Sequence, residues 1–131
     1  SLVAGLKAGF TYNTFPLMDG KVVPDGLWIF SPFYLNFFEN ITMVQFQHRV
    51  LGCASVIAVT MLWFKFLRNS NLYYSRKAAG ILAICIILQF LTGVVTLIYV
   101  VPISLASFHQ LMAFICLSVS IWILFSARGQ N

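Results

Sequence analysis

The stretch from Ala78 to Ala127 contains no Asp, Glu, Lys or Arg. Pro102 divides this stretch into one run of 24 residues (78–101) and another of 25 residues (103–127). About 20 apolar residues are enough for one helix to cross a bilayer. A chain with two such runs is expected to fold as membrane-spanning helices and not around a soluble core.

A third uncharged run, Val50–Phe64, predicts another span from about Met43 to Phe66. The composition agrees, since 60% of the residues are hydrophobic and 8% are charged, against about 25% charged in soluble domains. We therefore predict an all-α membrane protein. Residues 42–127 form three transmembrane helices, 10–41 an outer aromatic loop and 128–131 a tail. Residues 1–9 are interpreted as the end of a fourth, truncated helix of a four-helix bundle, with a flexible tail as the alternative.

The basic residues predict how the chain is oriented. They bracket the connection between the first two spans and follow the last one: Lys65, Arg68, Arg76, Lys77 and Arg128. The positive-inside rule then places the 65–77 loop and the C-terminus on the cytoplasmic or matrix side. The lipid bilayer is the expected partner. Nucleic acid is not, because the basic residues form no stripe with base-stacking aromatic residues.

The outer loop is rich in aromatic side chains. Between Phe10 and Asn40 it carries nine of them, and aromatic rings favour the headgroup level of a membrane. Pro32 suits the first turn of a short helix. We expect an interfacial helix there, an arrangement that is also compatible with a lid over a cofactor.

The two histidines, His48 and His109, both lie within predicted spans. A capping box of Thr42 and Gln45 predicts one helix start, and Ser104 as N-cap predicts the other. Both histidines then lie roughly 8–9 Å below the outer ends of parallel helices, which occupy diagonal corners of such a bundle. Ionisable residues at such depths usually face the bundle interior. Haem iron takes axial histidine ligands, so the pair predicts a bis-histidine haem site with rings less than about 8 Å apart.

Small and polar residues accompany the histidines at helical spacing. Beside the His48 face these are Gly52 and Ser55, beside the His109 face Ala113 and Cys116, and on the middle helix Cys85, Gln89, Gly93 and Thr96. They suit a flat porphyrin, with Gly52 against its face, or ordinary packing of membrane helices. Two roles are open for Arg49: its side chain pairs with a haem propionate or extends to the lipid headgroups. No Cys, Asp or Glu lies at zinc-ligand spacing from the histidines.

Several segments resemble the C-terminal half of the haem A synthase family over residues 2–125, closest to its mitochondrial and alphaproteobacterial branch. The matching residues are Val3-Ala4-Gly5-Leu6, Ala8-Gly9, Tyr12-Asn13-Thr14-Phe15-Pro16, Phe38-Glu39-Asn40, Thr42-Met43-Val44-Gln45-Phe46, His48-Arg49, Leu105-Ala106 and His109-Gln110. Members of this family are oxidoreductases that convert the methyl group of haem O into the formyl group of haem A for cytochrome oxidase.

The resemblance implies half of a pseudo-symmetric protein of eight helices in the mitochondrial inner membrane or the bacterial cytoplasmic membrane. It assigns haem b to His48 and His109, and the reaction of haem O to haem A to a missing N-terminal half. That half has a glutamate directly before its first histidine, where this chain has Gln47. No catalytic residue carries over, and the chain alone is expected to be inactive. Lys7 also departs from the Asp expected there.

Two other functions remain open from the residues. One is a b-type cytochrome anchor that relays electrons, and the other is a structural helix bundle without a cofactor. A reduced-minus-oxidised spectrum would separate the structural bundle from the two haem proteins. A homologous upstream half would separate the synthase from the anchor. The sequence does not indicate the electron donor.

Overall fold

The computed structural model describes residues 2–68 and 73–128, and its regular elements there are all helices. In chain order they are α1 (Leu2–Gly5), η1 (Ala8–Phe10), η2 (Phe33–Leu35), α2 (Asn36–Glu39), α3 (Ile41–Leu67), α4 (Tyr73–Ile98) and α5 (Ile103–Arg128). The polar connection predicted at 69–71 and the tail residues 129–131 lie outside the described residues.

The three long helices confirm the predicted spans. Their membrane-spanning parts are Ile41–Leu67, Arg76–Ile98 and Ile103–Phe125, with mean hydropathies of 2.0, 2.7 and 1.9. A helix satisfies its backbone hydrogen bonds internally, which is what hydrocarbon surroundings demand. The fold is therefore all-α, with three helices long and apolar enough to cross a membrane.

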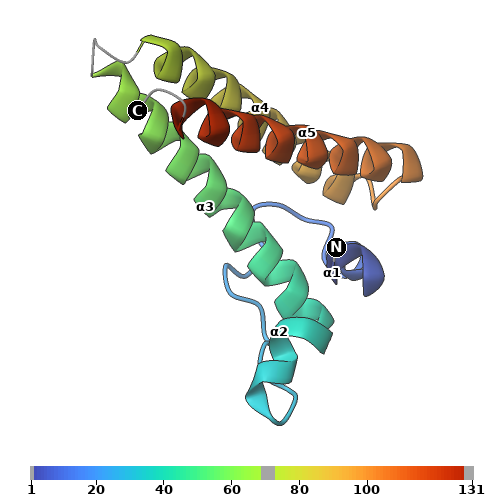
Figure 1. Cartoon of the computed structure of the whole chain (residues 1–131). Helices are drawn as coiled ribbons and strands as arrows, with labels where there is room; N and C mark the ends of the chain where they lie inside the picture. The colour runs from blue at the N-terminus through green and yellow to red at the C-terminus, as the bar shows by residue number, and fades with distance from the viewer. Residues whose placement is uncertain (1, 69–72, 129–131) are drawn as a thin grey trace.

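Helix α4 is in contact with both of the other long helices. It lies antiparallel beside α5 and also packs against α3 (Figure 1). Small residues bring these helices close, because they let neighbouring side chains approach the backbone. A Cβ added at Gly80 would lie 3.2 Å from Nε1 of Trp63, and one at Gly52 would lie 3.6 Å from the ring of Phe90. Contacts at two positions along α4, Gly80 and Phe90, thus fix its packing on α3.

The start of α3 differs from the prediction. Asn40, not Thr42, is the N-cap, because its side-chain oxygen accepts from the backbone N–H groups of Thr42 at 3.0 Å and Met43 at 3.3 Å. Asparagine is among the strongest N-cap residues. Gln45 does not close a capping box, since its amide donates to the Tyr12 carbonyl instead. The predicted capping box was wrong, and α3 begins at Ile41.

The start of α5 also differs from the prediction. The helix begins at Ile103, directly after Pro102, so Ser104 lies inside its first turn. Proline has no N–H to leave unpaired, and its carbonyl accepts from Ala106 N at 2.9 Å. The tight turn before it places Val100 and Val101 at φ values of 59° and 55°. His48 and His109 therefore lie in the second turns of their helices.

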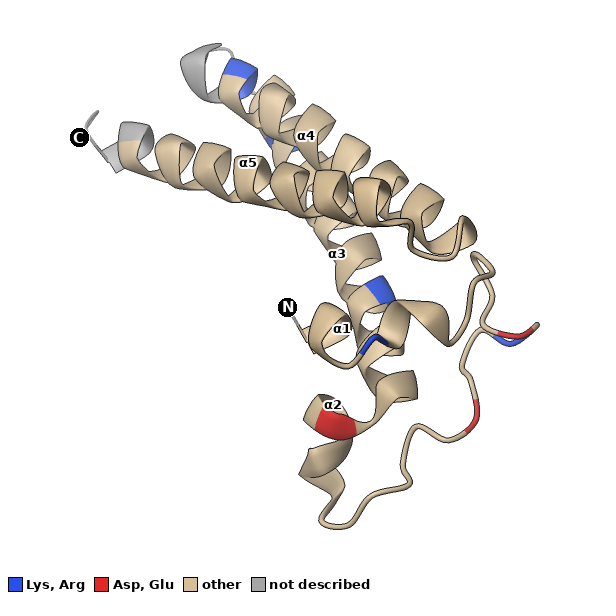
Figure 2. Cartoon of the chain, turned by 90° about the vertical axis from the view of Figure 1, so that its right-hand side faces the viewer, with Lys and Arg blue, Asp and Glu red and all other residues tan. Residues whose placement is uncertain are grey.

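The outer segment packs along the first half of α3. Pro32 precedes η2 and α2, and the buried side chain of Asn36 holds this region together by accepting from Ile29 N and Phe30 N, each at 3.0 Å. The acidic residues of the described chain lie in α2 and this loop, away from the first turns of α4 (Figure 2).

Candidate functional site

The structure brings the two histidines together. His48 on α3 and His109 on α5 have ring centroids 6.4 Å apart, with ring planes at 85°. Two imidazoles bound to one metal through nitrogen, with bonds of about 2 Å, have centroids roughly 6 Å apart. Among the described residues no group of three His, Cys, Asp or Glu side chains forms a further metal site. The pair thus has the separation that a shared metal ion requires.

His109 is held by two side chains of α4. Its Nδ1 lies 3.2 Å from the Thr92 hydroxyl, and its Nε2 lies 3.3 Å from the Gln89 amide nitrogen. The same ring lies directly over Gly93, where an added Cβ would be 2.8 Å from Cε1. Real Cβ atoms do not approach this closely, so the ring can occupy this place only beside a glycine.

Gln89 and Gly93 were expected on this face, and Thr92 was not. The stripe expected from the sequence consisted of residues 85, 89, 93 and 96. One face of a helix includes positions both three and four residues apart, so the stripe was drawn too narrowly. Position 92 follows 89 by the three-residue spacing. This wider face is the signal that would have found Thr92.

The His48 ring has different surroundings. It is exposed, and within residues 2–68 and 73–128 the structure records no hydrogen bond to it. One turn further along, Gly52 faces Phe90, whose ring also makes an edge contact with Phe15 at 5.8 Å. In this structure Gly52 therefore provides room for an aromatic side chain of α4.

Arg49 binds the outer loop. Its guanidinium donates to the carbonyls of Tyr12 and Thr14, each at 2.8 Å, and more weakly to that of Leu17 at 3.4 Å. Backbone carbonyls are a third kind of partner, besides the haem propionate and the headgroups that the sequence suggests. Nη1 and Nη2 are engaged in this way, while the buried Nε has no partner among the described residues.

Replacing Arg49 should loosen this loop. Hydrogen bonds from a charged donor contribute about 1.5–3 kcal/mol each, so losing the two short bonds in Arg49→Leu is expected to weaken the attachment of the loop by about 3–6 kcal/mol. Limited trypsin digestion at Lys21, followed by mass spectrometry, should then be faster than in the wild type. Lys65→Leu is the control, because it removes a positive charge from α3 without contacting the loop. Equal cleavage rates in the two variants would contradict the role of Arg49.

Two further side chains tie the loop to the helices. The Asn13 amide donates to the carbonyls of Gly9 at 2.9 Å and Leu97 at 3.0 Å, and Gln45 donates to Tyr12 O at 2.8 Å. These bonds connect η1, α3 and α4 at the histidine end of the structure. Sequence reasoning missed them, because a carbonyl acceptor is available at every residue and leaves no pattern of side chains.

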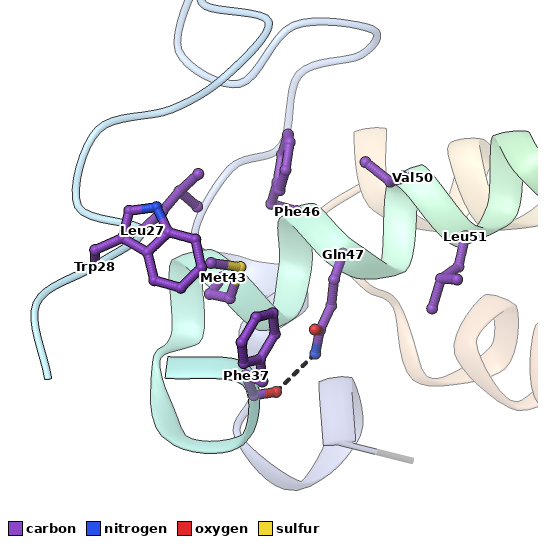
Figure 3. A pocket seen from close by; sticks show the side chains of 8 residues that line it. All are labelled: Leu27, Trp28, Phe37, Met43, Phe46, Gln47, Val50 and Leu51. Carbon is purple, nitrogen blue, oxygen red and sulfur yellow. Dashed lines mark hydrogen bonds between the residues drawn. The ribbon is translucent and has the colours of Figure 1, made fainter. Parts of the chain in front are cut away.

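A separate apolar groove lies on another face of α3. Figure 3 shows its eight lining side chains, which come from the outer loop, α2 and α3: Leu27, Trp28, Phe37, Met43, Phe46, Gln47, Val50 and Leu51. Gln47 donates from its amide to the Phe37 carbonyl at 2.8 Å. Since residues 43, 46, 47 and 50 occupy the helix face opposite 48 and 52, Gln47 is not part of the histidine site.

The helices and the histidine pair define a multi-pass membrane protein in which two imidazoles from different helices lie close together, edge to face. Residues 1–121 match the family model COX15-CtaA, described as cytochrome oxidase assembly protein. The chain belongs to this family, whose curated relatives are membrane enzymes named heme A synthase.

Relatives from bacteria and from an animal are similar over nearly the whole chain. The heme A synthase of Nitrosomonas eutropha is 39% identical over 122 residues, which cover 93% of this chain and 34% of that protein. Heme A synthase COX15 of Bos taurus is 44% identical over 128 residues, covering 98% and 31%. That of Bartonella tribocorum is 42% identical over 124 residues, covering 93% and 35%.

The chain thus spans about a third of the length of the curated relatives that it matches. No solved structure has significant similarity to it.

Proposed function

We propose that this chain is the haem b-binding C-terminal half of a haem A synthase, with His48 and His109 as the two axial ligands. The observation that carries the proposal is the 6.4 Å separation of the two ring centroids. Family membership supports it, because the relatives named heme A synthase align with nearly all of this chain.

The chemistry of the site fits such a group. Haem iron commonly takes histidine as its axial ligand, and two imidazoles complete six-coordination. Arg49, the chain neighbour of His48, and Gln89, which contacts His109, each carry a buried polar atom without a partner among the described residues: Nε and Oε1. Buried polar atoms in proteins nearly always have a partner. The site is therefore suited to a ligand that is both flat and polar at its edge.

The residues of this half bind and orient the group. His48 and His109 hold it from two helices, and Thr92 and Gly93 keep the His109 ring in place. Arg49, Gln45 and Asn13 attach the outer loop beside it. When bound, a haem of this kind supplies one-electron transfer.

The oxidation of haem O to haem A belongs, in this proposal, to the rest of the synthase. Moving a proton requires an acid or base within hydrogen-bond reach of the substrate. The acidic residues of the chain are Asp19, Asp25 and Glu39, which all precede α3. Gln47 stands next to His48 but faces the separate groove. This half therefore supplies no catalytic residue of its own.

The proposed orientation follows the charge distribution. Lys65, Arg68, Arg76 and Lys77 lie at the joined ends of α3 and α4, whereas the histidines lie toward the opposite ends. The positive-inside rule supports a matrix or cytoplasmic position for the 65–77 end. The membrane is then the mitochondrial inner membrane or the bacterial cytoplasmic membrane.

Expression of this chain in a strain that lacks haem A synthase and makes haem O tests the proposal. We expect the membranes to show a b-type reduced-minus-oxidised spectrum that depends on the chain, and extracted haems to contain no haem A. Haem A in the extract would contradict the division of labour between the halves. A spectrum identical to that of membranes without the chain would contradict the haem site.

A further inference from the structure

We infer that Thr92 is a positioning residue for His109, which it holds in the tautomer that carries its proton on Nδ1 and leaves Nε2 free to bind iron. The inference rests on the proposed haem site. It assigns a role to a residue of α4, the helix that carries no histidine.

The Thr92 hydroxyl sets the tautomer through its single proton. Its Oγ1 donates to the Gln89 carbonyl at 2.9 Å, so the proton is already used. The same oxygen lies 3.2 Å from Nδ1 of His109. A hydroxyl that has donated its proton can only accept from a second partner. With its proton used in this way, the Thr92 oxygen accepts from a protonated Nδ1, which is the tautomer that we infer.

The Gln89 amide, with its nitrogen placed toward the ring, agrees with this tautomer. Its nitrogen Nε2 lies 3.3 Å from Nε2 of His109, and an amide NH₂ group can only donate. In a neutral imidazole one nitrogen is a donor and the other an acceptor. His109 Nε2 is therefore the acceptor, with its lone pair in the ring plane.

Iron binding would affect the two hydrogen bonds of His109 differently, opening the one to Gln89 and retaining the one to Thr92. The Nε2 lone pair cannot both accept from Gln89 and bind a metal, so the Gln89 contact must open. The Thr92 contact lies on the other nitrogen and is retained. Metal-bound histidines generally donate their second N–H group to a hydrogen-bond acceptor, which fixes the ring and raises its basicity as a ligand. Thr92 provides that acceptor for His109.

The test compares three variants of the protein in detergent. Thr92→Val removes the hydroxyl at nearly constant shape, and Thr92→Ser retains it. Thr96→Val is the matched control, because Thr96 lies one turn away on α4 and its hydroxyl donates to the Thr92 carbonyl at 2.7 Å, with no recorded hydrogen bond to either histidine in the described part of the chain.

The first measurement is made without haem. With only two histidines in the chain, ¹⁵N NMR of histidine-labelled protein resolves the ring nitrogens of His109. We expect protonated Nδ1 in the wild type, Thr92→Ser and Thr96→Val, and a mixture of tautomers in Thr92→Val. Protonation at Nε2 in the wild type would overturn the inference.

The second measurement is titration with iron protoporphyrin IX, followed by redox titration. Loss of such a supporting hydrogen bond typically weakens metal binding 10- to 100-fold. We expect a loss of about that size for Thr92→Val, together with a more positive reduction potential because the ligand becomes less basic. Thr92→Ser should restore both values, and Thr96→Val should leave them unchanged.

The two proposals fail in different ways. If haem binds and Thr92→Val behaves like Thr96→Val in both measurements, the role of Thr92 is wrong and the haem site stands. If no haem binds and the tautomer still depends on Thr92, the haem site is wrong and the orientation of His109 stands.

Discussion

His109→Ala and His48→Ala are each expected to abolish the six-coordinate b-type spectrum of the purified protein. Each variant removes one of the two imidazoles whose ring centroids lie 6.4 Å apart, and no third His, Cys, Asp or Glu in the described residues forms a cluster with the pair. The loss of haem affinity should exceed the roughly 10- to 100-fold effect that is typical of residues that only support a ligand.

The measurement is haem content per protein, by pyridine haemochrome, together with the reduced-minus-oxidised spectrum. Gln110→Ala is the control, because Gln110 is the exposed neighbour of His109 on α5. It should retain full haem content. Wild-type haem content in either histidine variant would exclude that histidine as an axial ligand.

Gly93→Ala is expected to have the next largest effect. The added Cβ would lie 2.8 Å from Cε1 of His109, so the ring must move away from α4 and from the Thr92 hydroxyl. Overpacking of this kind costs about 1–3 kcal/mol, equivalent to a loss of haem affinity of about 5- to 150-fold. Titration with iron protoporphyrin IX measures this change.

Gly52→Ala is the comparison for Gly93→Ala, because Gly52 is the other glycine that the sequence placed on a histidine face. Its Cβ would meet the Phe90 ring at 3.6 Å, an ordinary contact distance, so haem affinity should change little. If both variants bind haem as the wild type does, the packing of His109 on Gly93 does not position the ligand. If Gly52→Ala alone loses haem, position 52 and not position 93 lies against the porphyrin.

The sequence predicted the spans because hydrocarbon imposes a strong rule. A segment such as residues 103–125 has the length and the lack of charge that only a spanning helix explains. The histidine pair followed from the same rule, since two ionisable rings at matched depth in two parallel spans are costly unless they face a site. The structure places His48 and His109 beside each other.

Details that depend on contacts between distant segments did not follow from the sequence. Thr42 and Asn40 are both competent N-caps, and the choice of Asn40 is reinforced by its side-chain bonds to Gly26 and Leu27 in the outer loop. Arg49 could reach several kinds of acceptor, and only the path of the loop shows that it binds carbonyls. Local patterns contain no information on such contacts.

The packing of α4 has a consequence for engineering. This helix acts as a spacer between the two helices that carry the histidines, because Gly80 faces Trp63 of α3, Phe90 faces Gly52 of α3, and Gly93 receives the His109 ring of α5. The distance between the two histidine rings therefore depends on the side-chain volumes of a helix that carries no histidine. A designer who wants a wider or narrower metal site should begin with positions 80, 90 and 93 and leave both histidines untouched.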